Sequence, residues 1–326
     1  MPNIDPNPRI DSVYAGAELC RKMGINLIIA MGGGSVIDCS KAIAAQANYY
    51  GDVWQDLYVE QKLNTLTSAL PVASILTLAA TGSEMNGNSV ISNMHTNQKL
   101  AIGHDLLRPV FSILDPEYTF TVNQYHTAAG VVDILSHLFE QYFTPDQEGY
   151  LQNRLMEAMM KTVIEYGPIA YNELDDYEAR ANLMWTSSLA LNGMVTYGKV
   201  STDWATHGME HELSAFYDIT HGVGLGILTP YWMKYVLSEE NVHRFVEYGK
   251  NVWNLDGENN MEIANKAINK TREFFSSLGI PSTLKEVGID ESKLDKMAEQ
   301  ATMFGALGSM KKLYKEDVLA IHKMAL

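Results

Sequence analysis

Short apolar runs alternate with helical stretches over the first third of the chain. The runs that predict strands are residues 26–31, 71–78, 88–92 and 110–114. A helix is predicted from Ser35 to about Tyr50, because Ser35 is a good N-cap and alanines follow it. Strands separated by helices predict a mostly parallel α/β sheet.

After about residue 120 the spacing of apolar positions becomes that of helices. The clearest helical stretches are residues 133–143, 150–166, 179–192 and 261–278. Pro168, Pro230 and Pro281 are expected to separate helices. The pattern therefore predicts an α/β domain over residues 1–120, followed by an all-helical domain over residues 121–326.

The charge balance limits the classes of function. The chain has 326 residues, with 24 Lys and Arg against 39 Asp and Glu, which gives a formal net charge of −15. Nucleic-acid binding needs a basic face, so a nucleic-acid partner is not expected. Cys20 and Cys39 make no disulfide framework. With no apolar run long enough to span a membrane and no secretory leader, the chain is expected to be cytoplasmic.

A run of glycines connects the first predicted strand to the first predicted helix. Gly32, Gly33 and Gly34 precede Ser35, where the helix N-terminus would present free N–H groups to an anion. A tight turn without a ligand explains the same residues. The run matches neither the G-x-G-x-x-G motif nor a Walker A loop, so those motifs do not decide between the two readings.

A second polar loop, residues 77–84, follows the next predicted strand. It contains Thr77, Thr81, Gly82 and Ser83, and it resembles the glycine loop in its hydroxyls and glycine. Ligands of open α/β sheets bind beyond the carboxyl ends of the strands. Two such loops would line one crevice, and this favours a nucleotide site.

Histidines and an aspartate cluster in the predicted helical domain. Asp133 and His137 are four residues apart and would share one helix face. His207, His211 and His221 follow within fifteen positions. One carboxylate with two or three imidazoles suits a divalent metal such as Fe²⁺ or Zn²⁺, although each pair alone is more often a hydrogen-bonded core contact. The spacing does not choose among the last three histidines.

Five segments occur in an order that resembles a known family. They are GGGSVID (32–38), ATGSE (80–84), LDPEYT (114–119), VVDILSHLFEQY (131–142) and ATHGMEHELSAFYDITHG (205–222). The chain resembles the iron-containing, or group III, alcohol dehydrogenases, in particular their butanol dehydrogenase and broad aldehyde reductase branch. The resemblance implies a dehydroquinate-synthase-like architecture, in which a Rossmann-like nucleotide-binding domain faces a helical metal-binding domain. A lyase or polyol dehydrogenase on the same fold is disfavoured by the last segment.

The resemblance also implies a role for individual residues. The metal ligands of the family match Asp133, His137, His207 and His221, and the non-ligand histidine near the nicotinamide matches His211, a candidate proton relay. The cofactor contacts of the family match Gly33, Gly34, Ser35, Asp38, Thr77, Thr81, Asn86 and Lys99.

The implied reaction is hydride transfer between NAD(P)H and a small aldehyde such as butanal, with the metal polarising the carbonyl. A homodimer is expected. The glycine motif lies closer to the start of the chain than in the family, so one or two strand–helix units are expected to be missing before it. That segment sets the nucleotide preference. We expect NADP(H) rather than NAD(H), because this branch mostly uses it. The alternative is a truncated, non-catalytic homologue that keeps the metal site and the dimer surface.

Overall fold

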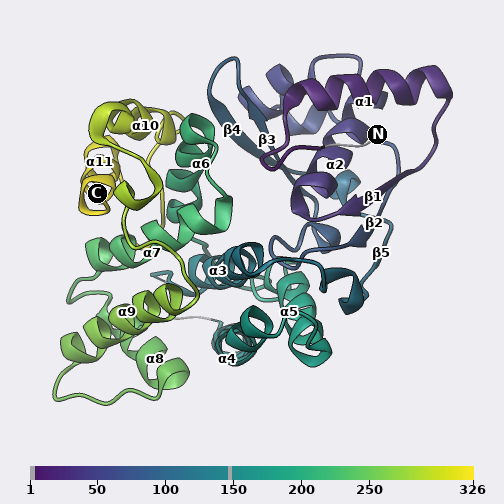
Figure 1. Cartoon of the computed structure of the whole chain (residues 1–326). Coiled ribbons are helices and arrows are strands. Elements are labelled where there is room, and N and C mark those ends of the chain that lie inside the picture. The colour runs from purple at the N-terminus through teal and green to yellow at the C-terminus, as the bar shows by residue number, and fades with distance from the viewer. Residues whose placement is uncertain (1–3, 146–148) are drawn as a thin grey trace.

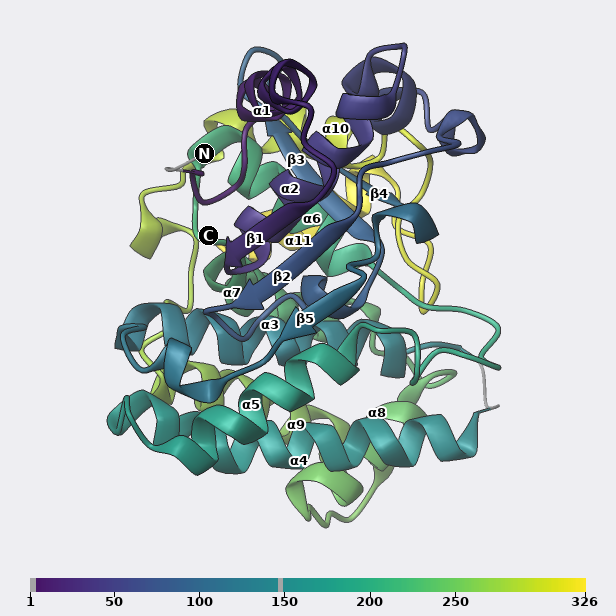
Figure 2. The ribbon, with the colours of Figure 1, turned by 90° about the vertical axis from the view of Figure 1, so that its right-hand side faces the viewer.

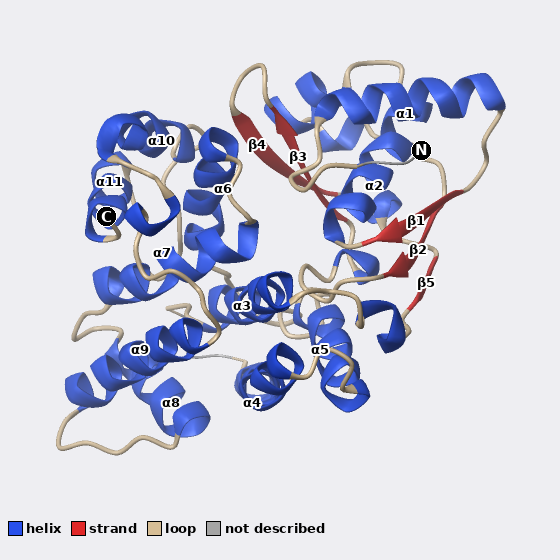
Figure 3. Ribbon diagram, in the orientation of Figure 1, coloured by secondary structure: helices blue, strands red, loops and turns tan. Residues whose placement is uncertain are grey.

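The structure is a computed structural model that describes residues 4–145 and 149–326. In the described part of the chain, all strands lie before residue 114 and helices make up most of the rest, so the predicted α/β plus all-helical fold class is confirmed (Figures 1 and 3). The helices of the first part are α1 (Ile10–Met23) and α2 (Gly34–Asn48), with one turn of π-helix at Trp54–Val59.

Three strands form a parallel sheet in the order β1-β2-β5, namely β1 (Ile28–Gly32), β2 (Val72–Leu76) and β5 (Phe111–Ile113). Figure 2 shows these strands side by side, with α3 and α5 below them. Gly32 pairs with Leu76 at the carboxyl ends of β1 and β2. The glycine loop and the second polar loop therefore begin next to each other, as the sequence predicted.

A separate antiparallel hairpin carries β3 (Asn88–Asn93) and β4 (Gln98–Gly103). The strand predicted at residues 88–92 exists, but it does not belong to the parallel sheet, and β4 was missed by the sequence analysis. The hairpin turns at Asn97, which has a left-handed φ of 51°. β4 packs against α6 of the helical domain, so the hairpin connects the two parts of the molecule.

The N-cap of helix α2 lies two residues earlier than the sequence suggested. This residue is Gly33, which corrects the prediction of Ser35 as the cap. Gly34 is required by a close approach, because a Cβ there would lie 2.4 Å from the hydroxyl oxygen of Thr81. The glycine run thus allows the two loops to touch each other.

The helical part consists of α3 (Gln124–Tyr142), α4 (Tyr150–Asn172), α5 (Tyr177–Ala190), α6 (Ala205–Tyr217), α7 (His221–Val236), α8 (Val242–Trp253), α9 (Asn260–Ser277), α10 (Leu294–Ala301) and α11 (Lys315–Met324). Pro281 lies outside the helices, but Pro168 and Pro230 lie inside α4 and α7, where breaks were predicted. An internal proline costs about 3 kcal/mol of helix stability. Burial of Trp232 and Met233 beyond Pro230 explains why α7 continues.

Helix α3 runs through the middle of the molecule (Figure 1) and is buried from Thr127 to Tyr142. Buried ionisable groups need partners, so the carboxylates and imidazoles on this helix must be satisfied by its neighbours. Within the described residues, none of the helices is both long and apolar enough to span a membrane.

Candidate metal and cofactor site

Helix α3 contributes three ionisable side chains on one face. Asp133, His137 and Glu140 stand at i, i+4 and i+7, and all three are almost completely buried. This face is directed toward α6 and the start of α7.

Helices α6 and α7 place two further imidazoles opposite this face. His207 and Glu210 lie three residues apart on α6. The chain reverses at Asp218, whose φ of 53° is left-handed, and His221 then becomes the first residue of α7. This tight connection places His221 next to Glu210.

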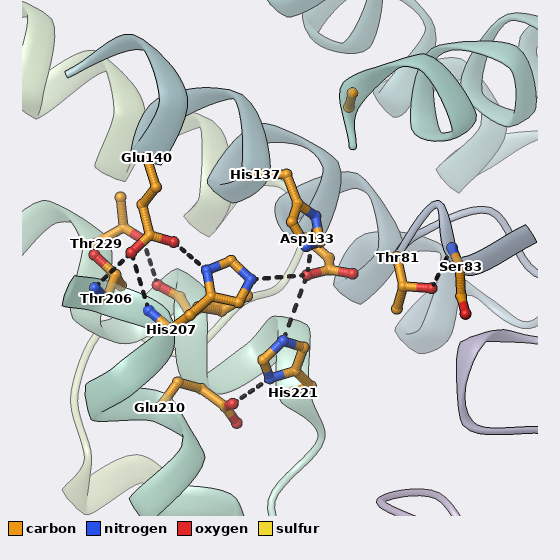
Figure 4. A network of polar contacts seen from close by, with 12 residues as sticks. Thr81, Ser83, Asp133, His137, Glu140, Thr206, His207, Glu210, His221 and Thr229 are labelled. Carbon is orange, nitrogen blue, oxygen red and sulfur yellow. Dashed lines mark hydrogen bonds and ion pairs between the residues drawn. The ribbon is translucent and has the colours of Figure 1, made fainter. Parts of the chain in front are cut away.

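The side chains of Asp133, His137, His207 and His221 converge on one point (Figure 4). Asp133 Oδ1 lies 3.6 Å from His137 Nδ1, 3.9 Å from His207 Nε2 and 3.7 Å from His221 Nε2. Among the described residues, Asp133 Oδ1, His137 Nδ1 and His207 Nε2 have no hydrogen-bond partner although all are buried. Unpaired polar atoms at one buried point are groups that a bound cation would satisfy.

Two glutamates orient the histidines from behind. His207 Nδ1 contacts Glu140 Oε2, and His221 Nδ1 contacts Glu210 Oε2, so the Nε2 atom of each ring points toward Asp133. A carboxylate on the far nitrogen of a histidine is typical of metal ligands. The sequence analysis missed both glutamates, although Glu140 follows His137, and Glu210 follows His207, by three residues.

The distances between the candidate ligand atoms and the neutral ring of His137 fit one divalent metal. Tetrahedral ligands at about 2.1 Å from a metal stand about 3.4 Å apart, close to the distances found here. Burial lowers the pKa of His137 to about 4, so this ring is neutral near pH 7, as a ligand must be. Burial opposes the charged form of His207, but Glu140 outweighs it and raises the pKa of His207.

His211 stands beside this cluster. Its ring centroid is 5.8 Å from that of His221 and 6.5 Å from that of His207. Glu210, His211 and His221 also have potential ligand atoms within 4.8 Å of one another. Because Glu210 is already bound to His221 Nδ1, the group around Asp133 is the better metal site. Burial, followed by the Lys99 ammonium, lowers the pKa of His211 well below its ordinary value.

Two connected cavities adjoin the cluster. A cavity of about 360 Å³ is lined by Gly33, Gly34, Ser35, Thr77, Thr81, Asp133 and His221. A neighbouring cavity of about 470 Å³ is lined by Ser35, Asp38, Thr81, Asn86, Lys99, His137, His207, His211 and His221. All the predicted cofactor residues thus lie along one path that ends at the predicted metal ligands.

Three of the predicted cofactor residues, Asp38, Asn86 and Lys99, also form hydrogen bonds with other residues of the protein. Asp38 accepts from the Ser83 hydroxyl at 2.5 Å and from the Val90 N–H at 2.9 Å. The amide of Asn86 donates to Gly82 O and accepts from the Asn88 N–H. These bonds shape the second loop.

The third residue, Lys99, reaches across the cavity to the metal site. Its ammonium donates to Asn7 Oδ1 and Ser214 Oγ at 3.0 Å, and it lies 3.4 Å from Glu210 Oε2. The charges of His221 and Lys99 outweigh burial and lower the pKa of Glu210. Asn7 also donates to Asp218 Oδ1, so the beginning of the described chain is tied to the helical domain.

A glycine loop on a parallel sheet, facing buried imidazoles and a carboxylate, is the combination expected of a nucleotide-dependent oxidoreductase with a metal. Comparison with known proteins identifies the family. The family model of iron-containing alcohol dehydrogenase matches residues 1–116, and that of the C-terminal domain of the Fe-containing alcohol dehydrogenase family matches residues 127–326. The chain belongs to the iron-containing alcohol dehydrogenases and is an oxidoreductase.

Individual relatives support a narrower class. NADH-dependent butanol dehydrogenase A of Clostridium acetobutylicum is 55% identical over 99% of this chain and 83% of its own length. NADPH-dependent aldehyde reductase YqhD of Escherichia coli is 38% identical over 93% of this chain and 78% of its own. The crystal structure of NADH-dependent butanol dehydrogenase A from Thermotoga maritima superimposes with a TM-score of 0.93 at 37% identity, covering 99% and 82%. The chain is therefore an alcohol dehydrogenase or aldehyde reductase.

Proposed function

We propose that the protein reduces small aldehydes such as butanal to primary alcohols with NAD(P)H and one Fe²⁺ or Zn²⁺ ion. The observation that carries the proposal is the convergence of one buried carboxylate oxygen and three imidazole nitrogens beside the two cavities that the glycine loop and the second polar loop line. Asp133, His137, His207 and His221 would hold the metal. When bound, the metal supplies Lewis-acid chemistry, and the nicotinamide supplies the hydride.

The glycine loop would bind the pyrophosphate of the cofactor. The first N–H groups of α2, at Gly34 and Ser35, are at the positive end of the helix and border the cavity. Thr77 and Thr81 present hydroxyls to the same cavity from the second loop. A path from this loop to His221 would orient the nicotinamide toward the reacting carbon.

His211 would conduct the proton that completes the alcohol. Because its pKa is lowered, the ring is neutral at pH 7. A neutral imidazole accepts a proton at one nitrogen while it donates from the other, so it can connect the cavity to solvent without becoming a stable cation. An orienting role without proton transfer is the alternative for this residue.

The decisive experiment follows oxidation of the reduced cofactor with butanal. The metal-free protein would be assayed alone and after addition of Fe²⁺ or Zn²⁺, with both NADPH and NADH, and with His207→Ala as the control. Turnover that needs the metal and disappears in His207→Ala is the expected result. One bound metal per chain without turnover would favour the non-catalytic homologue.

The same assay compares the two cofactors. NADH-dependent and NADPH-dependent relatives both resemble the chain, so the expected preference for NADP(H) stays a prediction. The homodimer, the cytoplasmic location and the absence of a nucleic-acid partner also stay predictions.

A further inference from the structure

Trp204 has a backbone conformation that is rare for a bulky residue. As the N-cap of α6 it has φ 63° and ψ 15°, in the left-handed region. Asp203 fixes this conformation by accepting from the N–H groups of Ala205 at 3.0 Å and Ser309 at 2.7 Å. The indole N–H of Trp204 donates to Thr202 Oγ1 at 2.7 Å. Strain held from several sides is common where a side chain must point in a functional direction.

The indole lies against the candidate metal site. Its centroid is 5.3 Å from that of His207 and 6.2 Å from that of His137, and both contacts are edge-on. Tyr142 and Phe143, which are also close in sequence to the site, are fully buried in the hydrophobic core and serve packing. Of these three aromatic residues, Trp204 lines the cavity of about 470 Å³ beside the candidate metal ligands, which we call the reaction cavity.

Trp204 also lines a second cavity of about 510 Å³. The reaction cavity and the second cavity share Asn86, Asn88, Leu191 and Trp204. The second cavity is polar, because its other walls include Asp105, Arg108, Gln141, Asn192, Thr196 and Thr202. A polar cavity therefore adjoins the reaction cavity, and the indole is by far the largest of the shared side chains.

The space on the metal side is limited. A nicotinamide ring and the aldehyde must share the cavity of about 470 Å³. We expect a short alkyl tail to fit beside the indole, whereas a longer tail would have to pass the indole to reach the polar cavity. We propose that Trp204 is a specificity-determining residue that limits the substrates to short, unsubstituted alkyl aldehydes by closing the passage to the polar cavity. This inference rests on the proposed function.

The test compares two aldehydes in matched variants. The ratio of kcat/KM for 6-hydroxyhexanal to that for butanal would be measured in the unaltered holoenzyme, in Trp204→Ala and in Trp204→Phe. We expect the ratio to rise at least about tenfold in Trp204→Ala, because removing the wall of a pocket changes discrimination by this order. Trp204→Phe keeps a ring and is expected to keep the original ratio. A rise of less than tenfold in Trp204→Ala would overturn the proposal.

A control variant and a binding measurement separate the possible causes. Trp185→Ala removes another tryptophan, half exposed on α5 and outside the described cavities around the site, and should leave the ratio unchanged. If Trp204→Ala fails to fold, Trp204→Leu replaces it, with the same expectation. Hexanamide and 6-hydroxyhexanamide are carbonyl analogues that are not reduced. Calorimetric titration measures their affinities, and so it tests without turnover whether a long, hydroxylated tail can pass residue 204.

These measurements distinguish a failure of the proposed function from a failure of the proposed role of Trp204. If the unaltered enzyme does not reduce butanal, the proposed function fails. In that case a relative gain of about tenfold in affinity for the hydroxyamide in Trp204→Ala still supports the role of Trp204. If butanal is reduced but the kcat/KM ratio rises less than tenfold in Trp204→Ala, the role of Trp204 fails and the proposed function stands.

Discussion

The imidazole of His207 stands between two carboxylates, with Nδ1 on Glu140 Oε2 and Nε2 3.9 Å from Asp133 Oδ1. Oε1 of Glu140 also accepts from the backbone N–H groups of Thr206 and His207, at 2.6 and 3.1 Å. One glutamate on α3 thus fixes both the start of α6 and the direction of its histidine. The orientation of the candidate ligand depends on this residue as much as on the histidine itself.

Replacement of this glutamate should weaken metal binding. We expect Glu140→Gln to lower the affinity for Zn²⁺ by roughly 10- to 100-fold, because the amide still accepts a hydrogen bond but no longer carries the charge that favours the ligand. Competition with a colorimetric chelator measures the affinity. Glu157→Gln is the matched control, since Glu157 is a buried glutamate on α4 that accepts from Tyr142 instead. Equal affinities in the two variants would contradict the role of Glu140.

The close approach of α7 to α3 positions His221. A Cβ on Gly222 would lie 2.0 Å from the carbonyl oxygen of Ala129, a backbone atom that cannot move aside. Gly222→Ala is therefore expected to push His221 away from Asp133, to weaken metal binding and to lower the free energy of unfolding by about 1–3 kcal/mol.

Gly208→Ala is the control for this substitution. The atoms nearest to a Cβ at Gly208 belong to the side chain of Leu307, at 3.0 Å, which can rotate. Urea unfolding of the metal-free proteins compares the two variants. A loss of stability for Gly208→Ala as large as that for Gly222→Ala would show that any added methyl group harms these helices.

Lys41 supports the second loop from inside the α/β domain. Its fully buried ammonium donates to three backbone carbonyls, Ser83 O at 2.7 Å, Asn86 O at 2.9 Å and Asn88 O at 2.8 Å. Lys41→Met leaves these carbonyls without their donor, and each such loss costs about 1–3 kcal/mol. We expect the dissociation constant of the cofactor to rise by about tenfold or more while one metal per chain is retained.

Fluorescence titration with NADH and NADPH measures this effect. Lys22→Met, on the exposed side of α1, removes a lysine that does not reach the loop and should bind the cofactors normally. Normal cofactor affinity in Lys41→Met would show that the loop keeps its shape without the ammonium.

The sequence predicted the elements that repeat a local pattern. The parallel strands, the helices and the pair Asp133 and His137 each follow from spacing along one segment, and the structure brings this pair together with His207 and His221. The hairpin β3–β4 was not predicted as such, because β4 contacts a helix more than a hundred residues later in the chain. Glu140, Glu210 and Lys41 were missed for the same reason. Their roles depend on partners from other helices or loops, and a single sequence does not show those partners.

Replacement of the neutral His211 should lower kcat. His211→Asn keeps a polar side chain but loses the ability to relay a proton, so kcat should fall by about 100-fold or more with the metal retained. Measurement of kcat in ordinary and deuterated water tests the role, because a lost relay increases the solvent isotope effect. A rise in KM alone, without a change in kcat, would assign His211 an orienting role only.

Acid stability depends on a histidine far from the cavities. His322 is fully buried on α11, and burial lowers its pKa to about 4 from an ordinary value near 6.5. Between these values the unfolded chain binds a proton that the folded chain does not, so protonation favours unfolding as the pH falls.

His322→Gln removes this proton uptake, and the unaltered protein should lose about 3 kcal/mol of stability relative to the variant between pH 6.5 and pH 4. Urea unfolding of the metal-free proteins measures this, since titration of the metal-site histidines is then common to both. His95→Gln, at an exposed histidine, should follow the unaltered protein. Parallel stability curves for the unaltered protein and His322→Gln would contradict the prediction.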